Sequence, residues 1–490
     1  MERLRALKNI KLGDYGHFFI LVFILDFFLI SNLLRIDSSF SSLDAGIKLD
    51  MVGDVNQVLS LNDAYIDEGV RVSNRDKEMT MDDVDYTVDS NVDASAVGDY
   101  QVKYHVVYDN KNYDLVRNVS VVDRTPPELV ILTSSVSRNE CGNNLKYYAV
   151  DNYDGILTDK VNVIEENGEF RLSVSDSSGN ETIKKVPINT EVNDYVLELN
   201  GTFYTYVPLN GTYTDEGVTV TNICGVNQNL DYTVDGGVDA TKTGTYTVNY
   251  RIPGVDAYQS RKVVVYDKIN DEVKLSDEEK VIYLTFDDGP GIYTEELLNI
   301  LDKYNVKATF FVTAQFTKFL PLLTREAESG HTVALHTKTH NWNLYRSFEN
   351  YYKDFTDMNK IIEEYTGKKT KLFRFPGGGS NTISKGKSTG VINYIASKMQ
   401  SGGYTYFDWN VDSGDAAGAN SKKIYENVIN GVSSRNYSVV LMHDIKRPTI
   451  DTIESIIVWG LNNGYTFKTL SSDSPTVHHH VNNWLLIYSL

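Results

Sequence analysis

The 490-residue sequence contains few cysteines and a deficit of cationic side chains. Only Cys141 and Cys224 are present, and they do not form a C-x-x-C pair. An exported protein could join them in a disulfide, but two unpaired thiols fit the sequence at least as well. Lysine and arginine total 47 against 66 aspartates and glutamates, which gives a net charge of −19. This balance argues against nucleic acid or an anionic membrane surface as the main partner.

Long apolar runs are also scarce, and the clearest one lies near the N-terminus. His17–Leu34 (HFFILVFILDFFLISNLL) has 14 apolar residues among 18, near the lower limit for a bilayer span. Asp26 at its centre costs about 3 kcal/mol, which the apolar residues outweigh. Cationic residues precede the run and no A-x-A cleavage site follows it. We therefore expect an uncleaved membrane anchor at 16–36, a cytoplasmic tail at 1–15 and the remainder outside the cell, with a buried core helix as the alternative.

An internal repeat organises the middle of the chain. LNDAYIDEGVRVSN begins at Leu61 and LNGTYTDEGVTVTN begins at Leu209, and each copy continues into DYTVD and an alternating apolar pattern. The residues between the copies show the same alternation of apolar and polar residues. This pattern predicts three small β-sandwiches, and the modules are expected at 50–125, 126–194 and 195–267. They resemble bacterial immunoglobulin-like surface modules, which implies spacing or attachment rather than chemistry.

One stretch of the second module carries several aspartates. VDNYDGILTD contains Asp151, Asp154 and Asp159, which could bind calcium. Their spacing does not match an EF-hand loop, so ordinary turn aspartates are the simpler interpretation.

The sequence pattern changes near residue 271. Apolar stretches such as VIYLTF, KATFFV and SVVLMHD alternate with helical stretches such as TEELLNILDKYN and TIESIIVWGLNNG. This alternation predicts a C-terminal α/β domain at 272–480 with a parallel sheet, open or closed into a barrel. In such barrels the chemistry lies where strands end and loops begin.

The first candidate site residues are two adjacent aspartates, Asp287 and Asp288, in YLTFDDGPG. A surface turn would explain them, but two neighbouring charges at the end of a buried strand also suggest a bound cation. His336 and His340 in ALHTKTHNW add two imidazoles, and His331 is close in sequence. Two imidazoles and one carboxylate suit a zinc-type ion and leave positions for water and substrate.

Further strand ends carry groups with catalytic potential. They are Arg374 in LFRFPGGGSN, Asp408, Asp412 and Asp415 in FDWNVDSGDA, and His443 in VVLMHD. Each alone has an ordinary structural explanation, but together they indicate one site. His478–His480, in SPTVHHHVNN, we interpret as the closing segment of the barrel rather than a metal site.

Residues 272–472 resemble the polysaccharide deacetylase family (NodB homology, carbohydrate esterase family 4), which implies a distorted (β/α) barrel. The matching motifs are Thr285–Pro290 (TFDDGP), His336–His340 (HTKTH), Arg374–Gly377 (RFPG), Asp412–Ala416 (DSGDA) and Leu441–His443 (LMH). The first two are unaltered and highly specific. The third has glycine where the family often has tyrosine, so an aromatic wall of the groove is expected to be lost. In the fourth, alanine replaces tryptophan.

The resemblance implies a divalent metal bound by Asp288, His336 and His340. Zinc is the favoured ion, with cobalt, nickel or manganese as alternatives. Asp287 is implied as the general base, with Arg374 keeping it ionised and oriented.

The remaining roles also follow from the resemblance. His443 protonates the leaving amine, and Asp415 raises its pKa through an ion pair. The backbone amide of Gly377 stabilises the oxyanion, Leu441 packs beside the acetate methyl, and Trp409 contacts the substrate.

The sequence therefore predicts a metal-dependent N-deacetylase of polysaccharides containing N-acetylglucosamine, held at the cell wall as a single-pass membrane protein. Peptidoglycan is the favoured substrate, and chitin, an exopolysaccharide or acetylated xylan remain alternatives. Two other classes are an inactive surface-binding protein and an iron oxygenase that shares the two-histidine, one-carboxylate ligand set. An oxygenase has no need of a base at Asp287 or an acid at His443.

Overall fold

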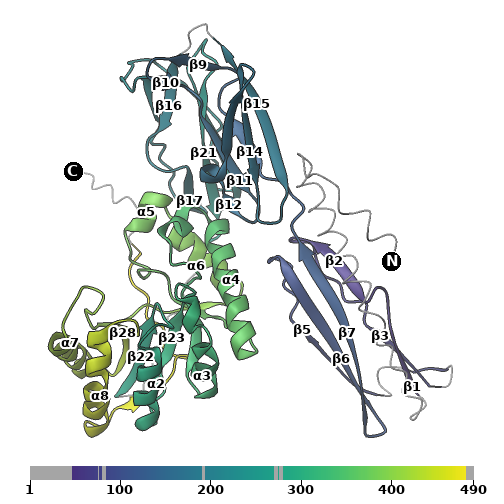
Figure 1. Cartoon of the computed structure of the whole chain (residues 1–490), viewed down its shortest axis with the longest axis vertical. Coiled ribbons are helices and arrows are strands. Elements are labelled where there is room, and N and C mark those ends of the chain that lie inside the picture. The colour runs from purple at the N-terminus through teal and green to yellow at the C-terminus, as the bar shows by residue number, and fades with distance from the viewer. Residues whose placement is uncertain are drawn as a thin grey trace, which may run out of the picture. The chain divides into compact units, whose positions relative to one another are not determined.

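The computed structural model of the chain describes residues 47–74, 77–79, 84–189, 194–269, 274 and 280–481. They belong to two compact units, of which the first ends at Val121 and the second begins at Val122 (Figure 1). Each unit is described by itself.

The predicted membrane topology requires a correction. The predicted tail (1–15) and anchor (16–36) lie outside the described residues. Within the described part of the chain, no helix combines the length and the apolar character that crossing a bilayer requires. The longest described helix, α4 (Phe348–Thr366), has 19 residues, seven of them charged. The prediction of a single-pass membrane protein is therefore wrong for the part of the chain that the structure describes.

The first unit is a sandwich of two sheets. One sheet has the order β1 (Ile47–Met51), β3 (Val70–Asn74), β4 (Lys77–Glu78), and the other has the order β2 (Asn56–Ser60), β7 (Lys111–Val122), β6 (Gly98–Tyr108), β5 (Asp85–Ser90). Strand β6 alternates buried Tyr100, Val102, Tyr104 and Val106 with more exposed residues. This period of two places one face of the strand in the core.

The second unit begins with another sandwich, which we call the second sandwich. Its larger sheet has the order β10 (Gly142–Asn143), β9 (Val136–Asn139), β15 (Glu181–Asn189), β14 (Glu169–Ser175), β13 (Asn162–Glu166). Its smaller sheet has the order β12 (Gly155–Ile156), β11 (Tyr147–Asp151), β8 (Glu128–Ile131). Apolar residues of both sheets, including Leu129, Ala149 and Leu172, form one core.

The third sandwich follows and resembles the first in its sequence motifs. Strands β16 (Tyr195–Leu199) and β18 (Val218–Asn222) form one sheet, and the other has the order β17 (Tyr204–Pro208), β21 (Tyr258–Tyr266), β20 (Gly244–Arg251), β19 (Thr233–Asp235).

The repeated DEGV motif is explained by a buried arginine in each copy. Arg261 is fully buried, lies 3.5 Å from a Glu216 carboxylate oxygen and 3.9 Å from one of Asp215, and donates to the carbonyl of Gly217. In the first sandwich Arg117 makes the corresponding contacts with Asp67, Glu68 and Gly69. Because a buried guanidinium requires compensating acceptors, the acidic pair and the arginine are retained together.

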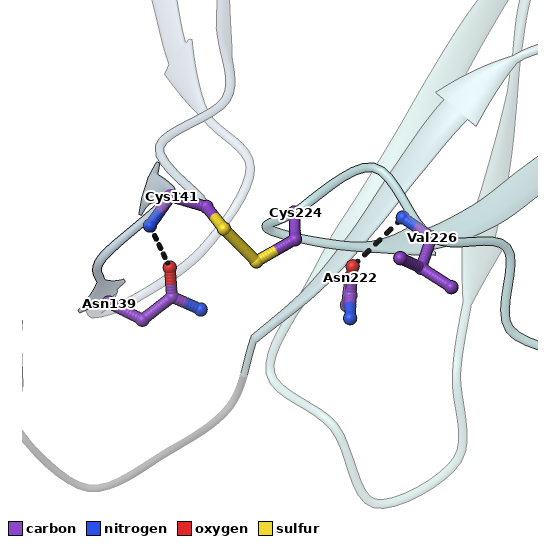
Figure 2. The surroundings of a disulfide bond; sticks show 5 residues. All are labelled: Asn139, Cys141, Asn222, Cys224 and Val226. Atoms are coloured by element: carbon purple, nitrogen blue, oxygen red, sulfur yellow. Dashed lines mark hydrogen bonds between the residues drawn. A yellow bond between two sulfur atoms is a disulfide. The ribbon is translucent and has the colours of Figure 1, made fainter.

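A disulfide between Cys141 and Cys224 joins the second and third sandwiches, with a Cα–Cα distance of 5.1 Å (Figure 2). Asparagine side chains accept backbone N–H groups on both sides of it: Cys141 N–H donates to Asn139 Oδ1 and Val226 N–H donates to Asn222 Oδ1, each at 2.9 Å. The sequence did not decide whether the two cysteines pair. They do, and their disulfide links the second sandwich to the third.

The C-terminal domain is built on an eight-stranded sheet in which every pairing is parallel. The order is β26 (Thr405–Tyr406), β25 (Leu372–Phe373), β24 (Thr332–Leu335), β23 (Thr309–Val312), β22 (Val281–Asp287), β28 (Tyr437–His443), β27 (Val411–Asp412), and β29 (Thr466–Phe467) also pairs with β22. All seven residues of β22 are buried, as expected for a central parallel strand.

Helices cover this sheet. Besides α4 they are α2 (Thr294–Lys303), α3 (Leu322–Glu328), α5 (Ile383–Lys387), α6 (Val391–Ser401), α7 (Ser421–Ser433) and α8 (Arg447–Asn462). The predicted alternation of strands and helices is confirmed, and β26 and β27 end the strand order, so the sheet is a (β/α) barrel open at one seam.

The third sandwich packs into the core of the C-terminal domain. Tyr206 of β17 is buried and stacks on Tyr394 of α6, with ring centroids 4.5 Å apart. The Tyr206 hydroxyl accepts a 3.1 Å hydrogen bond from the backbone N–H of Phe348, at the start of α4. Tyr204 and Tyr266 join the same apolar cluster. The two modules therefore share one core.

The second sandwich also contacts α4. The Asn350 side chain donates to the carbonyl of Asp154 at 2.8 Å and accepts from the N–H of Ile156 at 3.1 Å. Gly155, with φ +70°, sits between these partners, and a Cβ there would lie 2.7 Å from the backbone nitrogen of Asn350. Only glycine combines this backbone conformation with so close an approach.

We predict that Tyr206→Ala destabilises the second unit by about 3 kcal/mol or more, because it removes a buried aromatic ring from a core shared by two modules. Tyr206→Phe is the control and loses only the hydrogen bond from Phe348, about 1 kcal/mol. Calorimetric unfolding of both variants measures the difference. Equal melting temperatures for the two variants would contradict the shared core.

Candidate metal and catalytic site

The predicted site residues meet at one edge of the parallel sheet. Asp287 and His443 are the last residues of β22 and β28, while His336 and Arg374 directly follow β24 and β25. Carboxyl ends of parallel strands face the same side, and the structure therefore brings together side chains that lie up to about 150 residues apart in the sequence.

Asp288, His336 and His340 form the candidate metal group. One potential ligand atom from each lies within 4.8 Å of the others. The Asp288 Oδ1 atom is 3.7 Å from His336 Nε2 and 3.5 Å from His340 Nε2. This oxygen is buried and accepts no hydrogen bond from the described residues. An unsatisfied buried carboxylate oxygen facing two imidazole nitrogens fits a divalent cation well.

The fold also prepares His336 as a ligand. Its Nδ1 donates to the carbonyl of Arg374 at 2.9 Å, because a carbonyl oxygen can only accept. The other ring nitrogen, Nε2, is therefore left with its lone pair directed at the metal group. Burial, with a contribution from His340, holds the pKa of His336 well below its ordinary value. A neutral imidazole is the form that binds metal.

Unusual backbone conformations accompany these residues. Asp288, Thr337 and His340 have φ values of 74°, 65° and 53°. Non-glycine residues rarely occupy this left-handed region, and their clustering is typical of a functional site. At Asp288 this conformation ends the alternation of side-chain directions along β22, so both aspartates face His336. The Nε2 atom of His336 is also 3.8 Å from Asp287 Oδ2.

Asp354 of α4 supports the loop between the two histidines. Its Oδ1 accepts hydrogen bonds from the backbone N–H groups of Lys338, at 2.6 Å, and Thr339, at 3.0 Å. No sequence motif pointed to this residue. It lies in the next helix, and no spacing rule connects it with the HTKTH motif.

Asp287 forms a buried ion pair with Arg374, with 2.6 Å between Oδ1 and Nη1. Burial raises the pKa of the Asp287 carboxyl above its ordinary value, while the charges of Arg374 and His443 oppose that shift. A carboxylate whose pKa is raised toward neutrality is better suited to accept a proton than a fully exposed one.

Arg374 is held by four hydrogen bonds. It donates to the hydroxyl of Thr285 and the carboxylate of Asp287, and to the carbonyls of Phe407 and Asp408. The guanidinium is therefore fixed in position and cannot turn to other partners.

His443 forms the second buried pair. Its Nδ1 lies 2.8 Å from Asp415 Oδ1, and the other oxygen of Asp415 accepts from the His443 backbone N–H and the Thr449 hydroxyl, each at 2.7 Å. Burial by itself lowers the pKa of His443, but the hydrogen bond and charge of Asp415, with Asp287 and Asp288, raise it to about 9. His443 Nε2 lies 3.9 Å from Asp288 Oδ2, so this imidazole faces the metal group.

The glycine run after Arg374 is flanked by two tryptophans. Gly377 has φ +73°, and a Cβ there would lie 2.8 Å from the Trp342 ring; at Gly378 it would lie 2.8 Å from the ring of Trp409. Trp342 also packs edge-on against His340, with centroids 5.9 Å apart. The half-buried Trp342 therefore provides aromatic surface beside Gly377, where we expected an aromatic wall to be missing.

The other predicted contacts lie in the same region. Leu441 is buried on β28, two residues before His443. Trp409 is half-buried, and its carbonyl lies 2.7 Å from His479 Nε2.

Other sequence candidates lie outside this constellation. Asp412 is exposed and accepts the N–H of Gly414, as a turn residue does. His331 lies against Phe310 and accepts the N–H of Ala308. Asp408 is buried and structural, since its carboxylate accepts from Gly379 and His479 N–H groups at 2.8 and 2.7 Å.

The histidine-rich segment packs against the sheet. His478 stacks on Tyr406 with ring centroids 3.7 Å apart. His479 is held by Asp408 and by the carbonyl of Trp409.

Two parts of the chain match known families. Residues 274–391 match the family described as "Polysaccharide deacetylase", and residues 49–121 match "Bacterial surface protein, Ig-like domain".

The C-terminal domain is similar to named relatives. It is 35% identical over 215 residues to a peptidoglycan-N-acetylglucosamine deacetylase of Bacillus cereus. The aligned residues make up 42% of this chain and 74% of that protein. It is 32% identical over 195 residues to the peptidoglycan-N-acetylmuramic acid deacetylase PdaC of Bacillus subtilis, covering 39% and 38% of the two chains. A solved catalytic domain of a peptidoglycan N-acetylglucosamine deacetylase from Eubacterium rectale is 47% identical, with 44% of this chain and 98% of that one covered and a TM-score of 0.43.

We predict that Asp354→Ala lowers zinc affinity by about tenfold, because it releases two backbone N–H groups of the ligand loop. Glu364→Ala is the control: this residue also belongs to α4, but it is exposed near the C-terminal end of the helix. Competition with a chromogenic chelator measures both affinities. Equal zinc affinity in the two variants would show that Asp354 does not position the ligands.

Proposed function

This chain belongs to the polysaccharide deacetylase family, and on that premise we propose that it hydrolyses N-acetyl groups on the N-acetylglucosamine residues of peptidoglycan. The observation that carries the proposal is that two buried ion pairs, Asp287–Arg374 and His443–Asp415, both lie next to one candidate metal group. A site that hydrolyses an amide needs a base for the attacking water and an acid for the leaving nitrogen.

We propose that Asp288, His336 and His340 hold a divalent cation, with zinc favoured because two imidazoles and one carboxylate are its usual ligands. When bound, such a cation supplies Lewis acidity, which polarises a carbonyl and acidifies water. The neutral state of His336 and the unsatisfied Asp288 oxygen support this assignment.

The remaining steps are assigned to this chain's own side chains. Asp287 accepts a proton from the attacking water, and Arg374 keeps the carboxylate in place. The N–H of Gly377 stabilises the negative charge on the acetyl oxygen. His443 donates its proton to the amine nitrogen as the carbon–nitrogen bond breaks, so that acetate and a free amino sugar leave.

The substrate assignment comes from the named relatives. Two of the similar proteins above are named for N-acetylglucosamine in peptidoglycan and one for N-acetylmuramic acid in it. Trp342 offers an aromatic surface against which a sugar ring can pack, and Leu441 and Trp409 are proposed to line the same groove. The two buried pairs also argue against an inactive surface-binding protein and against an oxygenase, neither of which needs them.

We predict that Asp287→Asn lowers acetate release from peptidoglycan by about 10²-fold or more while zinc remains bound, because it removes the base and keeps the ligands. Asp412→Asn is the control, an exposed aspartate of the same sheet edge, and keeps wild-type activity. The full chain is assayed on peptidoglycan, chitin oligomers and acetylated xylan, and mass spectrometry of the digested product identifies the deacetylated sugar. Wild-type rates in Asp287→Asn would refute the assigned base, and acetate from another glycan alone would refute the substrate.

We predict that Asp415→Asn moves the alkaline limb of the kcat profile to lower pH by about one unit or more. His443 must carry a proton to act as the acid, and the Asp415 charge keeps that proton bound to higher pH. Without the charge the pKa of His443 falls, so activity declines at a lower pH. A profile identical to that of the wild type would exclude this pairing from catalysis.

A further inference from the structure

A second group of buried acids lies in the second sandwich. Asp123 follows β7, Asp151 ends β11 and Asp176 follows β14. Their exposed fractions are 4%, 3% and 8%, and one carboxylate oxygen of each lies within 4.8 Å of the others. Three segments of the chain therefore deliver carboxylates to one buried point.

Two oxygens of this group have no hydrogen-bond partner among the described residues. They are Asp123 Oδ2 and Asp151 Oδ2, both buried. The opposite oxygens are satisfied, since Asp123 Oδ1 accepts from Thr125 N–H and Asp151 Oδ1 accepts from the N–H groups of Tyr153 and Asp154. Buried carboxylate oxygens are rarely left unsatisfied, and two in one place require an explanation.

No cationic side chain balances these acids in the part of the chain that the structure describes. Lys353 pairs instead with the neighbouring Asp154, at 4.0 Å, and the other oxygen of Asp154 accepts hydrogen bonds from the N–H and hydroxyl of Ser177. Burial raises the pKa of Asp151 to about 6, and the charges of Asp123 and Asp154 act in the same direction, although backbone N–H groups oppose it. Ionised together, these carboxylates would repel strongly without a counter-ion.

We propose that Asp123, Asp151 and Asp176 form a calcium-binding site in the second sandwich. The donors are all carboxylate oxygens, which suit hard cations, and among the described residues the group includes no histidine or cysteine to favour zinc. Calcium accepts several protein oxygens in flexible geometry, whereas magnesium retains most of its water and is seldom enclosed by protein alone.

This ligand set differs from the alternative raised by the sequence. Of the three aspartates in VDNYDGILTD, only Asp151 takes part. Asp159 forms an ion pair with Arg346 of the C-terminal domain, and the side chain of Asp154 is held by Ser177. Asp123 and Asp176 come from outside that stretch, and no local spacing could have identified them.

The site also lies next to the contact between the second sandwich and α4. The same turn that begins at Asp151 presents the Asp154 carbonyl and the Ile156 N–H to Asn350. A calcium ion bound to Asp151 would therefore fix the turn on which this contact depends. We expect calcium to raise the melting temperature of the second unit.

Calcium binding to the full chain tests the proposal directly. The chelator-treated protein is titrated with calcium alone by isothermal calorimetry, with one calcium bound per chain at a Kd of about 10⁻⁴ M as the expected result. Asp151→Asn and Asp176→Asn are expected to weaken the affinity by at least about tenfold, because each removes one charged ligand. Asp159→Asn, in the same segment but outside the cluster, is the matched control and binds calcium as the wild type does.

A His336→Ala variant separates this site from the catalytic one, since it loses the metal group of the C-terminal domain and is expected to retain calcium. Circular dichroism establishes that each variant is folded. A wild-type chain that binds no calcium up to about 10 mM overturns the proposal without reference to any variant. Unchanged affinity in both asparagine variants, or equal affinity for magnesium, overturns it as well, and none of these results depends on acetate release.

Discussion

The buried guanidinium of Arg374 is the interaction on which the site depends. It ties the end of β22, through Thr285 and Asp287, to the carbonyls of Phe407 and Asp408. Asp408 in turn holds the glycine run through Gly379. Because a buried cation is costly without compensation, each of these acceptors must stay in place for the domain to fold. The same requirement that stabilises the sheet edge also positions the base.

Much of the site could be predicted because it follows from strand periodicity and topology. Asp287, His336, Arg374 and His443 all stand at carboxyl ends of parallel strands, so one architectural rule brings them together. Asp354 and Trp342 were not predicted because one lies in an α-helix and the other begins a 3-10 helix, and strand order does not determine their contacts. Of the buried acids of the second sandwich, Asp123 and Asp176 were also not predicted, because they come from outside the stretch that contains Asp151.

Other differences have separate physical causes. The sequence could not decide whether the cysteines pair, because that depends on how two modules meet. The single-pass topology was wrong for the described part of the chain, and the apolar run on which it was based lies outside that part. Gly377 stands where the family often has tyrosine, which suggested that an aromatic wall of the groove is lost. The ring of Trp342 lies close to Gly377, so aromatic surface can be supplied from elsewhere in the chain. The predicted module limits and the residue roles stay predictions.

The tyrosines of the third sandwich bear on how this protein could have been assembled and how it can be divided. Tyr204, Tyr206 and Tyr266 belong to the same apolar cluster as Tyr394, and Tyr266 packs edge-on against Tyr394 with centroids 4.9 Å apart. A cut between the third sandwich and the barrel would expose this aromatic surface to water. The border that the sequence motifs mark is therefore not a hinge at which genetic recombination could exchange modules freely.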